Sequence, residues 1–150
     1  MIYLIDTDVF SAITELRPNA DQKNVKNWFA TLNANDFGFP ALSLYERQWG
    51  IEQLIKTKSP NAAVIKNFLD QILQAYPASF VELDASATLL WPSLTMKMGK
   101  AKFMDAGILA CASSRTLTVA TRNYNDFKLN GVPLVNPFKI GLNPHDGVTP

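Results

Sequence analysis

Short apolar runs alternate along this chain with longer segments whose apolar residues recur every three or four positions. The short runs are rich in β-branched and aromatic residues, and they fall at residues 2–5, 37–39, 80–83, 117–120 and 132–135. Such runs are typical of buried strands, and strands that alternate with helices favour a mostly parallel sheet with helices on both faces. We therefore expect an α/β fold with about four to five strands, the last of them at an edge.

The segments between these runs carry signals for helix starts and interruptions. Ser43 followed by Glu46 has the capping-box pattern of a helix N-terminus. Pro92 is expected to kink or divide the helix that Asp84 or Ser86 caps. The expected helices cover residues 9–16, 21–34, 43–56, 59–75 and 103–114, with a turn or short helix at 123–127.

The length and composition fit one domain. The chain has 150 residues, of which 47% are hydrophobic and 18% charged, a balance that can bury a core without disulfides. We expect the domain to cover residues 1–138 and a loose tail, rich in Gly, Pro and Asn, to cover 139–150. No apolar run is long enough to span a bilayer, and the N-terminus lacks the features of a signal peptide, so no membrane partner is expected.

The chain contains one cysteine and one histidine. Cys111 lies in an apolar helical segment, where a small buried thiol suits the reducing cytoplasm. His145 lies in the tail, so nucleophilic sites that need a histidine base are disfavoured, and soft-metal sites lack their ligands. The net charge of +1 neither requires nor excludes a nucleic-acid partner.

Acidic and polar residues follow two of the predicted strands. Asp6 comes directly after the first apolar run, and Arg122, Asn123 and Asp126 follow the fourth. In a parallel sheet the carboxyl ends of the strands border the ligand crevice, which makes these residues candidates for a site. Ordinary local roles remain open, because Asp6 or Asp8 could cap the next helix and Asn and Asp favour turns.

Two further acids lie on predicted helices. Asp105 is the only charged residue of the segment 103–114, so it must cap that helix, pair with Lys102 or meet a cation. Glu46 could serve either the capping box or a site. Both interpretations of Glu46 stay open from the residues alone.

Four of these acids would repel one another if the fold brought them together, namely Asp6, Glu46, Asp105 and Asp126. Some of their pKa values would then rise unless a cation entered. Oxygen-only ligands suit hard divalent metals, and Mg²⁺ takes one or two carboxylates and keeps several waters. Such a centre can activate water for displacement at phosphorus. Lys102, next to two other lysines, could contact flanking phosphates or form a solvated helix end.

Four segments match a known family in order. They are Leu4-Ile5-Asp6-Thr7-Asp8-Val9, Leu44-Tyr45-Glu46-Arg47-Gln48-Trp49-Gly50-Ile51, Met104-Asp105-Ala106-Gly107-Ile108-Leu109-Ala110 and Thr118-Val119-Ala120-Thr121-Arg122-Asn123-Tyr124-Asn125-Asp126-Phe127. In this order they resemble the PIN-domain family, and most of all the VapC-like endoribonucleases, which are toxins of type II toxin–antitoxin systems. The likeness spans about residues 1–138.

The resemblance implies a PIN-like α/β sandwich around a parallel sheet with the acids at one end. It implies that Asp6 and Asp105 bind Mg²⁺, for which Mn²⁺ could substitute. Glu46 corresponds to the third acid of the site, and Asp126 supplies the fourth acidic function. The residues expected to contact the substrate are Thr7, Lys102, Arg122 and Asn123.

The resemblance also implies an activity and partners. The expected reaction is hydrolysis of RNA, with transfer RNA among the family's substrates, by metal-activated water. A homodimer is expected, together with a cognate antitoxin that buries a segment against the acidic crevice.

Two other functions fit parts of the sequence. Asp6-Thr7-Asp8 has the D-x-D pattern of haloacid-dehalogenase-type phosphatases, with Asp6 as nucleophile and Asp8 as acid/base. That function needs a further acidic pair, whereas Asp105 is followed by Ala106 and Gly107. The second alternative is a catalytically silent PIN module that keeps the fold for interaction.

Overall fold

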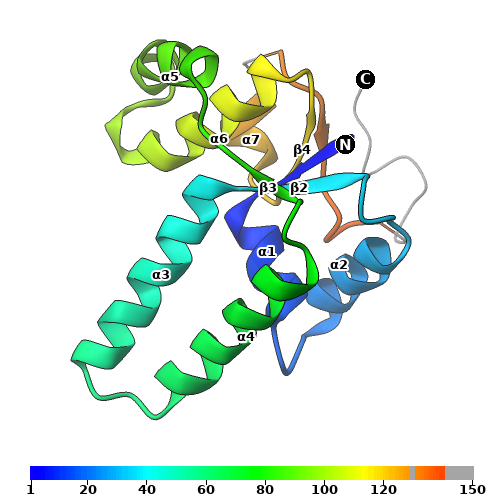
Figure 1. Cartoon of the computed structure of the whole chain (residues 1–150). Coiled ribbons are helices and arrows are strands. Elements are labelled where there is room, and N and C mark those ends of the chain that lie inside the picture. Colours follow the sequence, from blue (N-terminus) through cyan, green and yellow to red (C-terminus); the bar gives the residue numbers. More distant parts are fainter. Residues whose placement is uncertain (129–130, 141–150) are drawn as a thin grey trace.

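The computed structural model describes residues 1–128 and 131–140 of the chain. Most of the predicted tail, including His145, therefore lies outside the described residues, and the predicted domain boundary stays a prediction. Within the described residues, strands and helices alternate along the sequence (Figure 1). None of the described helices is long and apolar enough to cross a membrane.

Five strands form one parallel sheet in the order β3-β2-β1-β4-β5. The strands are β1 (Tyr3–Ile5), β2 (Phe37–Pro40), β3 (Phe80–Val81), β4 (Thr118–Ala120) and β5 (Leu134–Val135). The first strand lies in the middle, where Leu4 is in register with Gly38 of β2 and with Val119 of β4. The predicted α/β fold with a parallel sheet and an edge strand at its end is confirmed.

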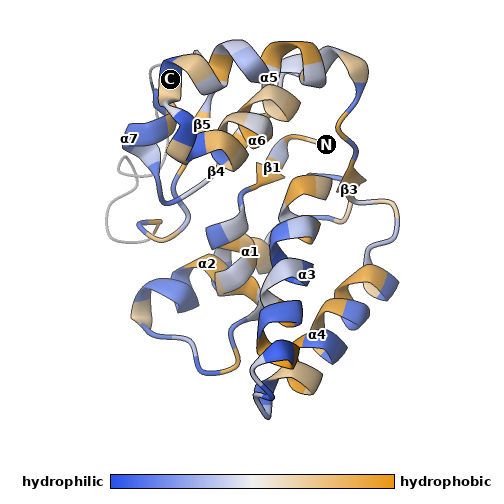
Figure 2. Ribbon diagram, turned by 90° about the vertical axis from the view of Figure 1, so that its left-hand side faces the viewer, coloured by the Kyte–Doolittle hydropathy of each residue, from blue (hydrophilic) through white to orange (hydrophobic). Residues whose placement is uncertain are grey.

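Helices cover both faces of this sheet. They are α1 (Thr7–Thr14), α2 (Ala20–Ala30), α3 (Ala41–Lys56), α4 (Asn61–Ala75), α5 (Ala85–Met98), the 3₁₀ turn η1 (Lys100–Lys102), α6 (Phe103–Ser114) and α7 (Tyr124–Phe127). In Figure 1, α5, α6 and α7 lie on one side of the sheet and α1 to α4 on the other. Figure 2 shows α3 running away from the sheet and α4 returning toward it, and the two helices pack against each other.

The core is divided by the sheet because successive strand residues point to opposite faces. Leu4 and Val119 belong to the cluster under α5, α6 and α7. Ile5 and Ala120 belong to the cluster under α1 to α4. The strands are therefore buried on both faces, as their uninterrupted apolar sequences indicate.

Helix α6 has the predicted bounds, and every residue from Ala106 to Ala112 is buried, Cys111 among them. Gly107 allows α3 and α5 to approach it, because an added Cβ would lie 2.5 Å from Leu42 Cδ1 and 2.7 Å from Trp91 Cε2. Pro92 lies inside α5 and does not divide it, so of the two predicted effects only a kink remains open. The helix packs extensively against α6.

The start of α3 differs from the prediction. The helix begins at Ala41, with Pro40 as its N-cap and no capping side chain among the described residues. Strand β2 ends at Pro40, whose backbone (φ −63°, ψ 138°) turns the chain directly into the helix. The predicted capping box of Ser43 and Glu46 is therefore wrong, and both side chains are available for contacts with other elements.

Candidate active site

Asp6 occupies the position between β1 and α1 at the centre of the sheet. Its side chain is 2% exposed. Its Oδ1 accepts a hydrogen bond from the Thr7 backbone N–H (2.7 Å), so Asp6 caps α1. Its Oδ2 accepts from the Thr121 hydroxyl (2.6 Å), which lies directly after β4. The two adjacent parallel strands β1 and β4 thus fix one carboxylate at their shared carboxyl edge.

The surroundings of Asp6 are unfavourable for the negative charge of its own carboxylate. Burial raises the pKa of Asp6 from its ordinary 3.8 to about 8, with further contributions from the nearby carboxylates of Asp8 and Asp105. The hydrogen bonds from Thr121 and Thr7 oppose this rise in the pKa only in part. Such a carboxylate gains most from a cation placed beside it.

Thr7 connects Asp6 to α3. Its hydroxyl donates to Glu46 Oε2 and lies 2.8 Å from the Ser43 hydroxyl. Ser43 is fully buried, on the side of α3 that faces α1. Glu46 therefore contacts α1 at Thr7, the residue after Asp6. Its membership of the site stays a prediction.

Asp105 and Asp126 meet at the ammonium of Lys102. The distance from Lys102 Nζ is 2.7 Å to Asp126 Oδ2 and 3.7 Å to Asp105 Oδ2. Burial raises the pKa of Asp105, Lys102 lowers it and Asp126 raises it again. The hydrogen bond from Lys102 to Asp126 raises the pKa of Lys102 itself. Lys102 pairs with Asp105 as predicted and also bridges to a second acid.

The segment after β4 approaches Asp8 through its backbone. Asp8 Oδ2 accepts from the Arg122 N–H (3.1 Å), while its buried Oδ1 has no hydrogen-bond partner among the described residues. Burial raises the pKa of Asp8. The Arg122 guanidinium lies over the Phe138 ring, 3.8 Å from its centroid, and the Asn123 N–H donates to the Thr121 hydroxyl (3.0 Å).

The structure thus places the predicted residues in one connected neighbourhood, at different distances from its centre. Asp6, Asp8 and Asp105 interact electrostatically, Asp105 interacts with Asp126, and Glu46 joins through Thr7. The Arg122 guanidinium lies over Phe138, and its charge also lowers the pKa of Asp8. The hydroxyls of Thr121 and Ser43 were missed by the sequence analysis. Thr121 heads the Thr-Arg-Asn run after a strand, and this position was its available signal.

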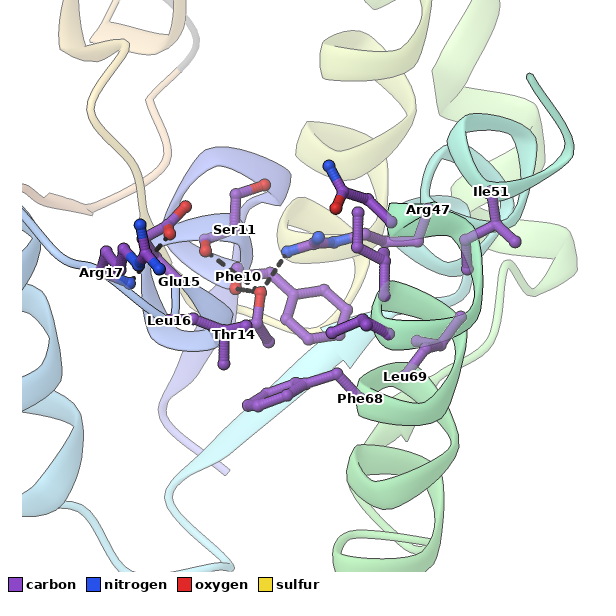
Figure 3. Close-up of a pocket in the computed structure, with 13 residues that line it drawn as sticks. Phe10, Ser11, Thr14, Glu15, Leu16, Arg17, Arg47, Ile51, Phe68 and Leu69 are labelled. Carbon is purple, nitrogen blue, oxygen red and sulfur yellow. Dashed lines mark hydrogen bonds between the residues drawn. The ribbon is translucent and has the colours of Figure 1, made fainter. Parts of the chain in front are cut away.

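A pocket lies elsewhere, at the far end of α1. It has a volume of about 500 Å³ and is formed by α1, α3 and α4. Figure 3 shows apolar side chains of α1, α3 and α4 in its lining, together with polar ones such as Glu15. Arg47 reaches across to α1, where it donates to the Thr14 hydroxyl (2.7 Å). The Arg47 guanidinium also lies 4.7 Å from the centroid of the Phe10 ring. The molecule therefore has two candidate binding sites, the acidic site and this apolar pocket.

Comparison with known proteins identifies the fold. The PIN domain matches residues 3–131 of this chain. The chain belongs to the PIN-domain family. Its sequence is 29% identical over 140 residues to Toxin FitB of Neisseria gonorrhoeae, which covers 90% of this chain and 97% of that toxin.

Solved structures agree with this assignment. The crystal structure of FitAcB from N. gonorrhoeae superposes with a TM-score of 0.75 at 26% identity, over 91% of this chain and 99% of that one. VapBC2 from Rickettsia felis, bound to a DNA fragment from its promoter, has a TM-score of 0.64 at 21% identity, over 86% and 92% of the two chains. The likeness to VapBC2, at 21% identity, concerns the fold alone. The predicted resemblance to PIN-domain toxins is confirmed.

PIN domains generally use divalent metal ions, so the donor atoms of this site decide whether it fits one. Within residues 1–128 and 131–140, no three Asp, Glu, His or Cys side chains are already arranged to hold a metal ion. The available donors are carboxylate and hydroxyl oxygens, including the unpartnered buried Oδ1 of Asp8. Mg²⁺ prefers such hard oxygen ligands and needs only one or two carboxylates. The residues fit a divalent hard cation, with Lys102 as a competing positive charge.

Proposed function

We propose that this PIN domain is a metal-dependent endoribonuclease and the toxin of a type II toxin–antitoxin system. The observation that carries the proposal is the buried Asp6, with its raised pKa, beside Asp8 and Asp105 at the carboxyl edge of the sheet. An arrangement this costly in free energy is typical of a functional site. The similarity to Toxin FitB supports the toxin role.

Asp6 and Asp105 are the proposed ligands of Mg²⁺, or of Mn²⁺ in its place. A divalent cation held there would supply positive charge for the phosphate and make a water molecule more acidic. Asp6 is oriented for this task by the hydroxyl of Thr121 and the N–H of Thr7. Glu46 accepts the Thr7 hydroxyl proton in a hydrogen bond and can position an attacking water on the α3 side.

The other side of the site supplies charge for the substrate. Asp126 holds the Lys102 ammonium within 2.7 Å of its carboxylate. With a cation bound at Asp105, Lys102 would keep its partner Asp126, and its ammonium could contact a phosphate oxygen of the RNA from that position. Asn123 lies on the exposed turn beside it and can donate to the substrate from its side-chain amide.

We assign the apolar pocket to the cognate antitoxin. Its lining includes the partly exposed Leu16, Val64 and Ile65, which an apolar segment would cover. The lining also includes Arg47, whose guanidinium could meet an acidic side chain of that segment. A homodimer is part of the same proposal and rests on the family resemblance.

The deciding experiment is an RNA cleavage assay with purified protein in Mg²⁺ and in EDTA. We expect cleavage in Mg²⁺ that EDTA abolishes and that Mn²⁺ restores. Asp105→Asn should lower the cleavage rate by at least about a hundredfold, because it removes a proposed metal ligand without changing the side-chain volume. Cleavage that survives both EDTA and Asp105→Asn would reject the metal mechanism.

The same preparation tests the two alternatives. The match to the PIN domain over residues 3–131 removes the main support for a phosphatase, which would hydrolyse a phosphomonoester in a manner abolished by Asp8→Asn. A silent interaction module would cleave no RNA in any metal while still binding an antitoxin.

A further inference from the structure

Two large aromatic side chains stand in solvent on α3. Tyr45 is 61% exposed and Trp49 is 58% exposed. Their ring centroids are 6.5 Å apart and their planes differ by only 17°. Neither ring contributes to the two clusters of the core. A pair of nearly parallel exposed rings presents π faces to whatever molecule binds beside it.

Helix geometry places this pair beside Glu46. Residues of an α-helix are separated by about 100°, so Trp49 lies about 60° and Tyr45 about 100° from Glu46 on one side. Gly50 lies about 40° from Glu46 on the other side, and no described atom lies within 4 Å of the position its Cβ would take. Glu46 is therefore bordered by aromatic rings on one side and by open space on the other.

Glu46 in turn connects the pair to the acidic site. Its carboxylate accepts from the Thr7 hydroxyl, and Thr7 follows Asp6. A substrate whose phosphate lay against the acids would have its neighbouring nucleotides within reach of this face of α3. The aromatic pair is thus continuous with the proposed catalytic residues.

We propose that Tyr45 and Trp49 form a stacking platform for unpaired bases of the RNA that flank the cleaved phosphate. This inference rests on the proposed ribonuclease function and adds a binding site to it. Base–aromatic stacking is tolerant of sequence, because every base has a π face. It would also supply affinity that the overall charge does not, since the net charge of the chain is only +1.

The surroundings of the pair favour a base over a protein partner. Polar side chains neighbour the pair on α3, and Gln48 donates to Glu52 there (2.7 Å), while the apolar Leu42 packs against the core. Two rings bordered by charged and amide side chains make a small apolar patch. A stable protein interface needs about 800 Å² on each partner, with a larger apolar centre. Two rings instead offer stacking faces for one or two bases.

The test uses binding and fluorescence with the full chain carrying Asp105→Asn, so that RNA is not consumed. The probe is a single-stranded RNA of about ten nucleotides of mixed sequence, compared with an abasic ribose-phosphate strand of the same length. We expect the RNA, and not the abasic strand, to quench the tryptophan fluorescence, and the abasic strand to bind about tenfold more weakly. Trp49→Phe should lose most of the quenching while it keeps the affinity, because Trp28 is buried and Trp91 is partly buried, with its ring packed on Phe103.

Matched variants separate stacking from general effects. Tyr45→Ala and Trp49→Ala should each weaken RNA binding by about tenfold, whereas Tyr45→Phe should bind as the parent does. In the cleaving protein these alanine variants should raise KM more than they lower kcat. Leu89→Ala, which removes an 81% exposed apolar side chain from α5, should change neither value.

Several outcomes overturn the platform. It is rejected if the abasic strand binds as tightly as RNA, if no RNA binds, or if the alanine variants keep full affinity. It is also rejected if those variants change the oligomeric state and leave RNA binding intact, because the pair would then contact a second copy. Cleavage by the parent with unaffected alanine variants would leave the ribonuclease standing without the platform. Base-dependent binding without any cleavage would leave the platform standing without the ribonuclease.

Discussion

The two ends of α1 present opposite chemistry. At its N-terminal end, Asp6 lies in a network of carboxylates and hydroxyls. At its C-terminal end, Phe10 and Leu16 line an apolar pocket. Helix α3 repeats this division, with Glu46 facing the acids and Ile51 facing the pocket. The same two helices therefore carry both features, and Asp6 and Thr14 are separated by about 12 Å along α1.

The difference teaches which kind of molecule each end can bind. At the acidic end the unfavourable energy is electrostatic, because buried carboxylates lie near one another. At the pocket end it is hydrophobic, because apolar side chains remain in contact with water. A cation relieves the first and an apolar segment relieves the second. Variants at one end should leave the other intact, and the following predictions test this separation.

The largest effect is expected for Asp6→Asn. The amide keeps the shape of the side chain and can still accept from the Thr7 N–H, but it loses the charge that would bind a metal ion. Cleavage should fall by about a thousandfold or more. Affinity for the antitoxin, measured by calorimetry, should change by less than about twofold if the two ends are independent.

The same variant should change the pH dependence of stability. The pKa of Asp6 is raised in the folded protein, so between pH about 4 and 8 the folded chain holds a proton that the unfolded chain has released. The free energy of unfolding should therefore fall as pH rises through this window. Asp6→Asn should reduce that slope and gain on the order of 2 kcal/mol near pH 8, in urea melts with EDTA. An unchanged slope would contradict the assigned pKa.

The next largest effect is expected at the pocket. Val64→Glu places a charge among the apolar side chains of α4 and should weaken antitoxin binding by about a hundredfold. Val64 is 51% exposed, so the free protein should fold normally and cleave RNA at the parental rate. Gln71→Glu adds the same charge to α4 outside the pocket and serves as the control. Equal binding by both variants would remove the pocket from the antitoxin interface.

A smaller effect is expected for Lys102→Gln. Its ammonium competes with a metal ion for Asp105 and Asp126, so its removal should tighten Mn²⁺ binding by about threefold to tenfold in calorimetry. Lys97→Gln makes the same change of charge on α5 and should have little effect. If Lys102 also contacts a phosphate, KM for RNA should rise while metal affinity increases. Weaker metal binding in Lys102→Gln would show that the lysine assists the cation.

The smallest effect is expected for Gly50→Ala. The added methyl group meets open space, and alanine favours the helix interior, so stability should rise by about 0.5–1 kcal/mol. Gly107→Ala is the opposite case, because its Cβ would lie 2.5 Å from Leu42 Cδ1, and it should lower stability. If Gly50→Ala slows cleavage in spite of its gain in stability, the substrate uses the space beside Glu46.

Elements with strong local patterns could be predicted from the sequence. The bounds of α6 follow from its continuous apolar composition, and β1 follows from the apolar run that ends at Asp6. The place of Asp6 at the carboxyl end of a strand follows from the alternation of strands and helices. Local sequence alone misplaced the start of α3, because the backbone of Pro40 outweighed the capping pattern at Ser43.

Contacts between distant elements could not be predicted in the same way. The hydroxyl of Thr121 reaches Asp6 across 115 positions, and Lys102 reaches Asp126 across 24. Neither pairing leaves a periodic trace in the sequence, because each depends on how strands and helices pack. The pocket is equally hidden, since its apolar residues resemble ordinary core positions until α3 and α4 are seen to leave part of them exposed.

The double role of Asp6 has a thermodynamic consequence. Its Oδ1 caps α1, and the last turn of α1 borders the pocket. Any ligand that draws this carboxylate away from the Thr7 N–H alters the helix that the other ligand touches. If that linkage has a measurable size, it must be reciprocal, because whatever factor an antitoxin imposes on metal affinity, the metal imposes on antitoxin affinity. A titration of one ligand at fixed levels of the other would then measure the coupling free energy between the two ends of α1.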